Sequence, residues 1–247
     1  MSFVDDMKHA IEDALNQSDE NLDWIAQNGP VIIDHLLNVY LAAYPVMGFA
    51  VNPIADRAKE ELAKAVETGR EGVELFRKEI QFVGSPDNLR AAASVIDDKV
   101  IAATRELASR LVLGNIPSAL PSNYSDGIAS ESYVAAIDGR DAAVQGVETY
   151  SSPISGALGE LADEIESYYR SLRDMALSLL GLIISIVAII VGWETIVIGV
   201  LGIIGAVISL VTLVFSIVDL VDSTNSVRES VGGALEAEVP AWPAVLA

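Results

Sequence analysis

Apolar residues recur along most of the chain at alternating steps of three and four. This spacing places side chains on one stripe of a slightly supercoiled helix. It is clearest over residues 53–83, 86–111 and 153–172. No stretch shows the strict apolar–polar alternation of a half-buried strand. The pattern predicts an all-α fold: an elongated antiparallel helical bundle with heptad-like packing.

Each of the three segments has its own apolar stripe. The first consists of Leu62, Val66, Val73, Phe76, Ile80 and Val83, with Gly69 in the gap. The second consists of Leu89, Ala93, Ile96, Val100, Ala103 and Leu107. The third consists of Ile154, Leu158, Leu161, Ile165, Tyr168 and Leu172, and it continues in phase through Met175, Leu179, Leu182 and Ile186. We therefore expect the third helix to run on as one continuous rod.

Prolines mark the expected helix starts. Asn52-Pro53, Ser85-Pro86 and Ser152-Pro153 each offer an N-cap followed by proline at the first helical position. Asn28-Gly29-Pro30 is expected to end one short helix and begin another, and residues 44–52 are expected to form a break.

Two long uncharged segments follow. Met175 to Val191 has seventeen residues and Thr195 to Val218 has twenty-four. At about 1.5 Å per residue they make helices of about 25 and 36 Å, against a hydrocarbon core of about 30 Å. Only Gly192, Trp193 and Glu194 separate them. This predicts a hydrophobic helical hairpin with a tight turn and an aromatic side chain where a membrane interface would lie.

Both segments are apolar around their whole circumference, which excludes a helix that lies on a membrane surface. The residues expected to enter a bilayer are Leu179, Leu182, Ile186, Ile190, Trp193, Glu194, Ile198, Leu201, Ile204, Ile208, Leu213 and Phe215. Small residues let helices approach closely in lipid. Those expected at such contacts are Gly181, Gly199, Gly202, Gly205, Ala206 and Ser209.

Three arrangements of the hairpin fit this pattern. It is a buried core hairpin that the other helices cover on all sides, or a permanent anchor, or a segment held against the bundle and released at a membrane. In the second arrangement Arg170 and Arg173 favour a cytoplasmic body. The continuous rod favours the third. The expected division is a helical body over 1–174 with a loop at 114–127, the hairpin at 175–218, and a partly irregular segment at 219–247.

The charge balance limits the partners. There are 35 acidic and 15 basic side chains, a formal net charge of −20. This charge repels nucleic acid and anionic lipid, so membrane affinity has to come from apolar burial. There is no cysteine, which excludes disulfides and cysteine-based sites. The first residues lack the basic and apolar regions of a secretory signal peptide. Acidity of this kind is typical of bacterial and archaeal proteins from high-salt or high-GC sources.

Few residues suggest catalysis. His9 and His35 lie in different expected helices without metal-ligand spacing, and Gly199, Gly202 and Gly205 lie in an apolar helix instead of a phosphate loop. The carboxylate pairs are expected on solvated faces; they are Glu60-Glu61, Asp97-Asp98 and Asp163-Glu164. We expect no catalytic residue, no metal and no cofactor, and therefore no enzyme.

Glu194 is the one ionisable group in the expected turn. In water a turn glutamate needs no further explanation. If the turn crosses lipid, the ionised carboxylate costs a few kcal/mol, and its protonation at low pH would lower that barrier.

Residues 85–172 resemble the helical hairpins of WXG100-type proteins, which are substrates and partners of type VII secretion. The resemblance lies in GSPDNLRAAASVIDDKVIAATRELASRL, the turn region NYSDGIASESY and the long helix that follows. It implies export without a cleaved signal peptide. Ser125-Asp126-Gly127 stands at the family's Trp-x-Gly turn, and Arg173 stands where the family's Tyr-x-x-x-Asp/Glu signal would follow Tyr169.

The layout of long rods with one hydrophobic hairpin is similar to that of α-helical pore-forming toxins of the cytolysin A and haemolysin BL type. This resemblance implies a secreted soluble form, a lipid bilayer as partner, and a homo-oligomer at the membrane. The alternative is a constitutively membrane-anchored or secretion-associated protein that binds partner helices.

Overall fold

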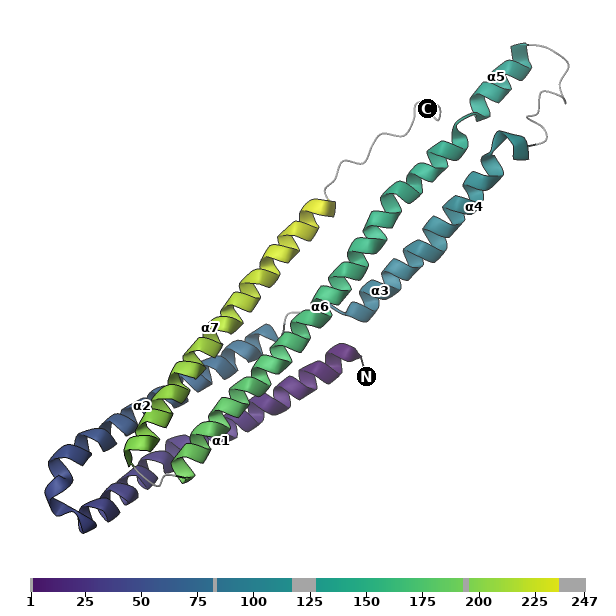
Figure 1. The fold of residues 1–247 in the computed structure, drawn as a ribbon. Helices are drawn as coiled ribbons and strands as arrows, with labels where there is room; N and C mark the ends of the chain where they lie inside the picture. The colour runs from purple at the N-terminus through teal and green to yellow at the C-terminus, as the bar shows by residue number, and fades with distance from the viewer. Residues whose placement is uncertain (1, 82–83, 117–127, 193–195, 236–247) are drawn as a thin grey trace. The chain divides into compact units, whose positions relative to one another are not determined.

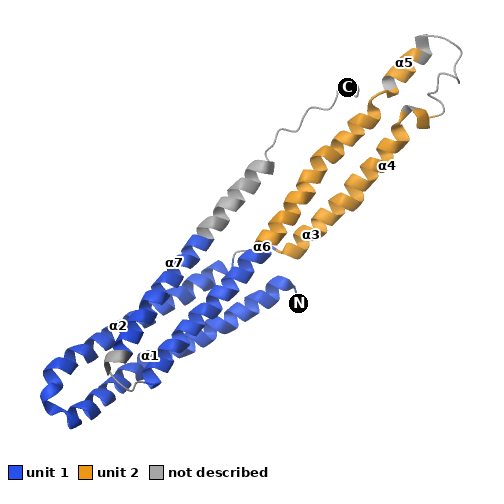
Figure 2. Ribbon diagram, viewed as in Figure 1, with its two compact units in different colours: residues 1–84, 166–226 blue, residues 85–165, 227–247 orange. Residues whose placement is uncertain are grey.

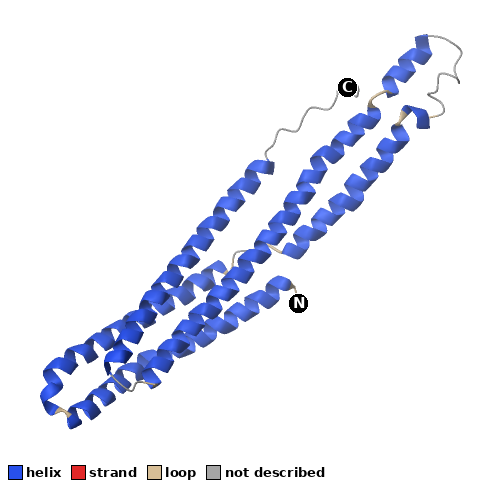
Figure 3. Cartoon of the chain, in the orientation of Figure 1, coloured by secondary structure: helices blue, strands red, loops and turns tan. Residues whose placement is uncertain are grey.

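The computed structural model describes residues 2–81, 84–116, 128–192 and 196–235, and every regular element among them is helical (Figures 1 and 3). The helices pack side by side, so the expected all-α bundle is confirmed. The chain divides into two compact units (Figure 2). Unit 1 consists of residues 1–84 and 166–226, and unit 2 of residues 85–165 and 227–247. This division differs from the linear body–hairpin–tail order expected from the sequence, because the hairpin belongs to the same unit as the N-terminal helices.

Helix α1 (Phe3–Ala43) opens unit 1 with a capping box. The Ser2 side chain accepts a hydrogen bond from the Asp5 amide (3.2 Å), and the Asp5 carboxylate accepts one from the Ser2 amide (3.1 Å). The helix runs through Pro30, so the expected end at residues 28–30 is wrong. Proline removes one backbone donor there, and the packing of both halves against the same neighbours outweighs that loss. His9 and His35 therefore lie in one helix, not in two.

Helix α2 (Gly48–Glu79) returns antiparallel to α1 after the 3₁₀ turn η1 (Pro45–Met47). The expected break therefore exists but is shorter than 44–52, and Pro53 lies inside the helix instead of at its start. The predicted stripe of α2 is buried throughout, except for Val83, which lies outside the described residues. Gly69 lets α1 and α2 approach closely, because a Cβ there would lie 2.7 Å from Leu22 Cδ2 of α1.

Ion pairs hold the register between α1 and α2. Arg70 Nη2 lies 2.7 Å from Asp23 Oδ1, and Arg77 Nη2 lies 2.7 Å from Asp19 Oδ2. Lys59 pairs with Asp34 nearer the turn. Surface pairs of this kind contribute little stability each. Their distribution along both helices nevertheless favours one antiparallel alignment over its neighbours.

In unit 2, helix α3 (Pro86–Val95) starts as predicted, with Ser85 Oγ accepting a hydrogen bond from the Asn88 amide (3.3 Å). It continues through one π-helical segment, η2 (Ile96–Ile101), into α4 (Ala102–Leu111). The short 3₁₀ turn η3 (Leu113–Asn115) follows.

The π-helical segment corrects the second predicted stripe. A π-helical turn holds one extra residue and therefore shifts the phase of everything after it by one position. Val100, Ala103 and Leu107 were expected inside and are exposed, and the residues that replace them inside are Ile101, Thr104 and Ala108. The part of the stripe before the π-helical segment keeps its predicted phase, at Leu89, Ala93 and Ile96, although these side chains are only half-buried.

Unit 2 is completed by α5 (Ile128–Ile137) and the first part of α6 (Arg140–Val191). Polar contacts join α3 and α4 to α6: Arg90 Nη2 lies 2.7 Å from Asp163 Oδ1, and Arg105 Nε donates to Glu148 Oε1 (2.9 Å). Of the expected loop at 114–127, residues 117–127 lie outside the described part of the chain.

Helix α6 is one continuous rod of 52 residues, which confirms the predicted continuation. The expected start at Ser152-Pro153 is wrong, because the helix has already begun at Arg140 and Pro153 lies inside it. The side chains buried along α6 recur every seven residues in two rows; the first is Ser155, Ala162, Tyr169, Ala176, Ile183 and Ile190, and the second is Leu172, Leu179 and Ile186. Helix α7 (Ile196–Leu235) follows α6 and runs back antiparallel to it (Figure 1).

Candidate functional site

The hydrophobic hairpin formed by the end of α6 and the start of α7 has two different faces. Its inner face is buried and consists of Leu179, Leu180, Ile183, Ile186 and Ile190 on α6, with Gly199, Val200, Ile203, Val207, Leu210 and Ile217 on α7. This part of α6 and α7 belongs to the same unit as the α1–α2 hairpin (Figure 2). The inner face meets α1 and α2 at Leu179 and Ile190. Of the residues expected to insert, Leu179, Ile186 and Ile190 belong to this inner face.

Two glycines mark where the hairpin touches α1 and α2. A Cβ on Gly72 of α2 would lie 3.2 Å from Val214 Cγ2 of α7 and 3.7 Å from both Cδ atoms of Leu179. A Cβ on Gly29 of α1 would collide with Leu62 Cδ2 of α2 and lie 3.7 Å from Ile190 Cδ1. Any larger residue at these positions would push the neighbouring side chains apart.

The α2 surface beneath the hairpin consists mostly of small side chains, with one large apolar residue. With 3.6 residues per turn, Ala58, Glu61, Ala65, Thr68 and the fully buried Phe76 fall within about 40° of Gly72 around the helix axis. They therefore face the same neighbours as Gly72, namely α6 and α7. Ala58, Glu61 and Ala65 are buried there. Helix α2 thus offers the hairpin a surface of mostly small side chains.

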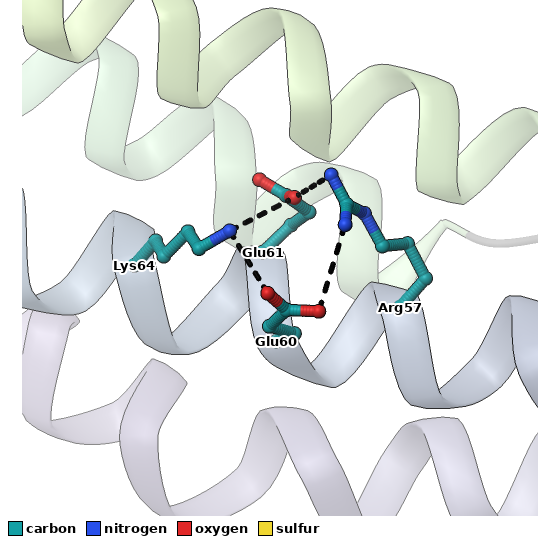
Figure 4. Close-up of polar contacts among 4 residues, drawn as sticks. All are labelled: Arg57, Glu60, Glu61 and Lys64. Carbon is teal, nitrogen blue, oxygen red and sulfur yellow. Dashed lines mark hydrogen bonds and ion pairs between the residues drawn. The ribbon is translucent and has the colours of Figure 1, made fainter.

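Glu61 is the exception in this apolar contact. Its side chain is 8% exposed, whereas that of the adjacent Glu60 is 55% exposed. Both carboxylates pair with the same two cations of α2 (Figure 4). Arg57 Nη2 lies 2.7 Å from Glu61 Oε1, and Lys64 Nζ lies 3.4 Å from it. The expectation that Glu60-Glu61 forms a solvated face is therefore correct for Glu60 and wrong for Glu61.

The other carboxylate pairs agree with expectation, since Asp97, Asp98, Asp163 and Glu164 are all exposed. Glu61 differs from them because of its helical phase. It lies eleven residues before Gly72, which is three turns of helix, and therefore points at the hairpin. An apolar stripe interrupted by one acidic residue is the only signal of this in the sequence.

The outer face of the hairpin is apolar and open. On α6 it carries Leu177, Ile184 and Val191, and on α7 Leu201, Ile208 and Phe215, each set spaced by seven residues. Leu201 is 66% and Phe215 65% exposed. Both helices are long and apolar enough to cross a membrane by length and composition, and only 33% of the residues in the most apolar stretch of each are buried. A core helix of a soluble protein would be mostly buried.

Of the other residues expected to insert, Leu201, Ile208 and Phe215 thus belong to the outer face, whereas Leu182, Ile204 and Leu213 are half-buried. The remaining three cannot be placed in the same way. Trp193 and Glu194 lie outside the described residues, and so does the side chain of Ile198.

The residues expected at close helix contacts divide into two groups. Gly202 lies at the contact between α6 and α7, since a Cβ there would lie 3.2 Å from Ile189 Cδ1. Gly199 is buried and Ala206 is half-buried. Gly181, Gly205 and Ser209 are exposed, and a Cβ on either of these glycines would meet no described atom within 4 Å. These three therefore make no close helix contact with the described residues.

Hydroxyl groups on the outer face carry their own hydrogen-bond partners. Ser178 donates to the carbonyl of Asp174 (2.8 Å), and Ser185 to that of Gly181 (2.8 Å). On α7, the hydroxyls of Ser209, Thr212 and Ser216 donate to the carbonyls four residues earlier, at 3.0, 2.9 and 3.0 Å. Such groups need no water, which is the condition for moving a helix into hydrocarbon.

Charged side chains lie on α6 directly before the first residue of the hairpin. Arg173 Nη2 lies 2.7 Å from Asp174 Oδ1, and Arg170 Nη2 lies 3.3 Å from Glu166 Oε2. The Arg170 guanidinium also lies over the Phe3 ring, 5.5 Å from its centroid. No charged residue follows on α6 up to its end at Val191.

A buried tyrosine lies just before this boundary. Tyr169 is fully buried, and its hydroxyl has no hydrogen-bond partner in the described part of the chain. Burial raises the pKa of Tyr169 to about 12. Burial, together with the nearby Glu79 carboxylate of α2, raises the pKa of Tyr168 to about 12 as well.

Within the described residues, no group of three His, Asp or Glu side chains could hold a metal ion. His9 pairs with Asp13 at 3.8 Å on the exposed surface of α1. No family model, curated protein or solved structure matches the chain.

Proposed function

We propose that this protein is a membrane-inserting helical protein of the pore-forming type. In this proposal the hairpin of residues 175–218 leaves the α1–α2 hairpin and enters a lipid bilayer, and several copies then assemble there. The observation that carries the proposal is the open apolar outer face on two helices of spanning length. In water this face is costly, whereas lipid covers it without any protein partner.

The contact between hairpin and body supports release. Once the hairpin leaves, α2 exposes Ala58, Ala65 and Gly72, which lose little apolar burial, and Phe76, which loses more. Glu61 gains water, so the desolvation of its carboxylate is relieved. The apolar inner face of the hairpin, which would lose most in water, is covered by lipid instead.

The continuous helix α6 supports the same movement. Because α6 has no break between its paired charges at Arg173 and its apolar end, the apolar part can advance as a rod. Its hydroxyls stay bonded to its own carbonyls on the way. The net charge of −20 means that the drive is apolar burial and not attraction to anionic lipid.

The test is dye release from phosphatidylcholine vesicles with Ile208→Asp. Ile208 is exposed, so the substitution leaves the folded bundle intact. A charge there opposes entry into hydrocarbon by about 3 kcal/mol. Leu107→Asp is the matched control, since Leu107 is also an exposed apolar residue but lies in unit 2. The proposal requires release by the wild type and by Leu107→Asp, and little release by Ile208→Asp.

A permanent anchor is the second candidate, and the same open outer face favours it. An anchored protein would remain in the membrane fraction and require detergent throughout. A releasable hairpin predicts a protein that purifies from the aqueous fraction and binds vesicles added later.

A further inference from the structure

The turn between α1 and α2 is unusual in an acidic chain because it lacks charge. Residues 36–55 contain no Asp, Glu, Lys, Arg or His, although the whole chain has 50 acidic and basic side chains. Charge resumes at once on both sides. Asp34 pairs with Lys59, and Arg57 pairs with Glu61. We refer to residues 36–55 as the tip.

The apolar side chains at the apex of the tip are open to solvent. Val46 is 83% and Phe49 82% exposed, and Tyr44 and Met47 are exposed as well. The rings of Tyr40 and Tyr44 lie 5.2 Å apart at an interplanar angle of 41°. Aromatic side chains with a polar end, set beside apolar ones, are typical of residues that lie at a membrane–water interface.

The tip projects beyond the end of the hydrophobic hairpin at the same end of unit 1 (Figure 1). Ile190, near the end of α6, lies at the level of Gly29 of α1. Fourteen residues separate Gly29 from Ala43, the last residue of α1, which is about 21 Å of helix. A surface approached by this end of unit 1 therefore meets the tip before it meets the hairpin.

The shape of the tip favours a bilayer over a protein as its partner. A single helix–helix turn is convex and presents only a few side chains. A stable protein interface buries about 800 Å² on each partner, which needs a broader surface. A bilayer interface deforms around a protruding protein segment, and it accepts a segment without charge.

We propose that the tip is a second membrane-contact site, which binds the interfacial region of a bilayer through Val46, Met47 and Phe49. The tyrosines lie behind them at headgroup level. This contact does not depend on the proposed insertion of the hairpin. It places the hairpin beside the membrane while the bundle is still closed.

The test separates binding from insertion by using a closed protein. The chain has no cysteine, so Gly72→Cys with Val214→Cys introduces one disulfide that holds α7 on α2. Flotation of this oxidised protein with phosphatidylcholine vesicles then measures binding without release of the hairpin. Val46→Asp with Phe49→Asp in the same background removes the apolar apex. The matched control is Val31→Asp with Leu107→Asp, two exposed apolar residues outside the tip.

We expect the closed protein and its control variant to float with vesicles. The tip variant should bind the vesicles about tenfold more weakly. Equal flotation of tip and control variants would overturn the inference, and so would the absence of binding by the closed protein. Neither result depends on dye release, so failure of the tip and failure of the hairpin are told apart.

Discussion

Gly72 of α2 lies directly against Val214 of α7: the Cβ that this glycine lacks would lie 3.2 Å from Val214 Cγ2. The three atoms nearest to such a Cβ all belong to α6 and α7, so a larger side chain at Gly72 acts first on the hairpin.

Gly72→Leu should therefore loosen the hairpin. Overpacking at a close contact costs about 1–3 kcal/mol, and this cost falls on the closed state only. We expect faster dye release from vesicles and a lower free energy of unfolding. Gly181→Leu is the control, because no described atom lies within 4 Å of a Cβ there. Release by Gly72→Leu at the rate of the control would show that this contact does not hold the hairpin.

Glu61→Leu should have the opposite effect. Glu61 is buried, whereas its partners Arg57 and Lys64 are about half exposed, so the substitution leaves no buried charge unpaired. Removing the desolvated carboxylate should therefore stabilise the closed state by about 1–2 kcal/mol. We expect a higher urea midpoint and slower dye release. Glu60→Leu removes a carboxylate with the same two partners from an exposed position and should change neither quantity. If the two variants behaved alike, burial of Glu61 would not be the cause.

Tyr169→Phe removes a buried hydroxyl that has no hydrogen-bond partner among the described residues. Losing an unsatisfied polar group should raise the free energy of unfolding by about 1 kcal/mol. Tyr168→Phe is the comparison, since its hydroxyl interacts with Glu79, and it should not stabilise the protein. Chemical denaturation of both variants measures the difference. A destabilised Tyr169→Phe protein would mean that the hydroxyl is satisfied in solution.

Alkaline pH should lower the free energy of unfolding of unit 1 through Tyr168 and Tyr169. The pKa values of Tyr168 and Tyr169 are about 12 in the fold, against about 10 for an unfolded tyrosine. Between pH 10 and 12 the unfolded state therefore binds fewer protons than the folded state, so the free energy of unfolding falls as pH rises through this window. Below pH 10 the two tyrosines contribute no slope. Urea titrations at pH 9 and 11 should show a smaller fall for Tyr168→Phe with Tyr169→Phe than for the wild type.

The sequence predicted the architecture where local pattern decides it. The third predicted stripe runs in one helical phase through Ile186, and α6 is one helix over this range. Of the stripe itself, Leu172, Leu179 and Ile186 are buried, Ile154 is exposed and the other residues are half-buried. The two uncharged segments of the hairpin can be recognised from the sequence equally well. The pattern does not show which face of the hairpin packs on α1 and α2, because every face of the hairpin is apolar.

Three errors have local causes. The sequence predicts helix starts at Pro30, Pro53 and Pro153, but each proline lies inside a helix whose packing on both sides outweighs one lost hydrogen bond. The phase of α4 was wrong by one residue because the π-helical segment Ile96–Ile101 has no sequence signature. Glu61 was expected in water, and only the position of α6 and α7 shows that its side of α2 is covered.

Two designed disulfides test the central claim most directly, because each restrains a different movement. A Cβ on Gly72 lies 3.2 Å from Val214 Cγ2, so with a bond of about 1.5 Å the two Cβ atoms lie within about 5 Å, close to disulfide geometry. Gly72→Cys with Val214→Cys ties the hairpin to the body. A Cβ on Gly202 lies 3.4 Å from Ile189 Cγ2, so Ile189→Cys with Gly202→Cys ties α6 to α7 and leaves the hairpin free to depart as a unit.

The measurement is dye release from phosphatidylcholine vesicles by each oxidised protein, before and after reduction. A releasable hairpin predicts that the 72–214 disulfide blocks release until it is reduced, whereas the 189–202 disulfide permits it throughout. Full release by the oxidised 72–214 protein would contradict the claim that the hairpin must leave the α1–α2 hairpin to enter the membrane.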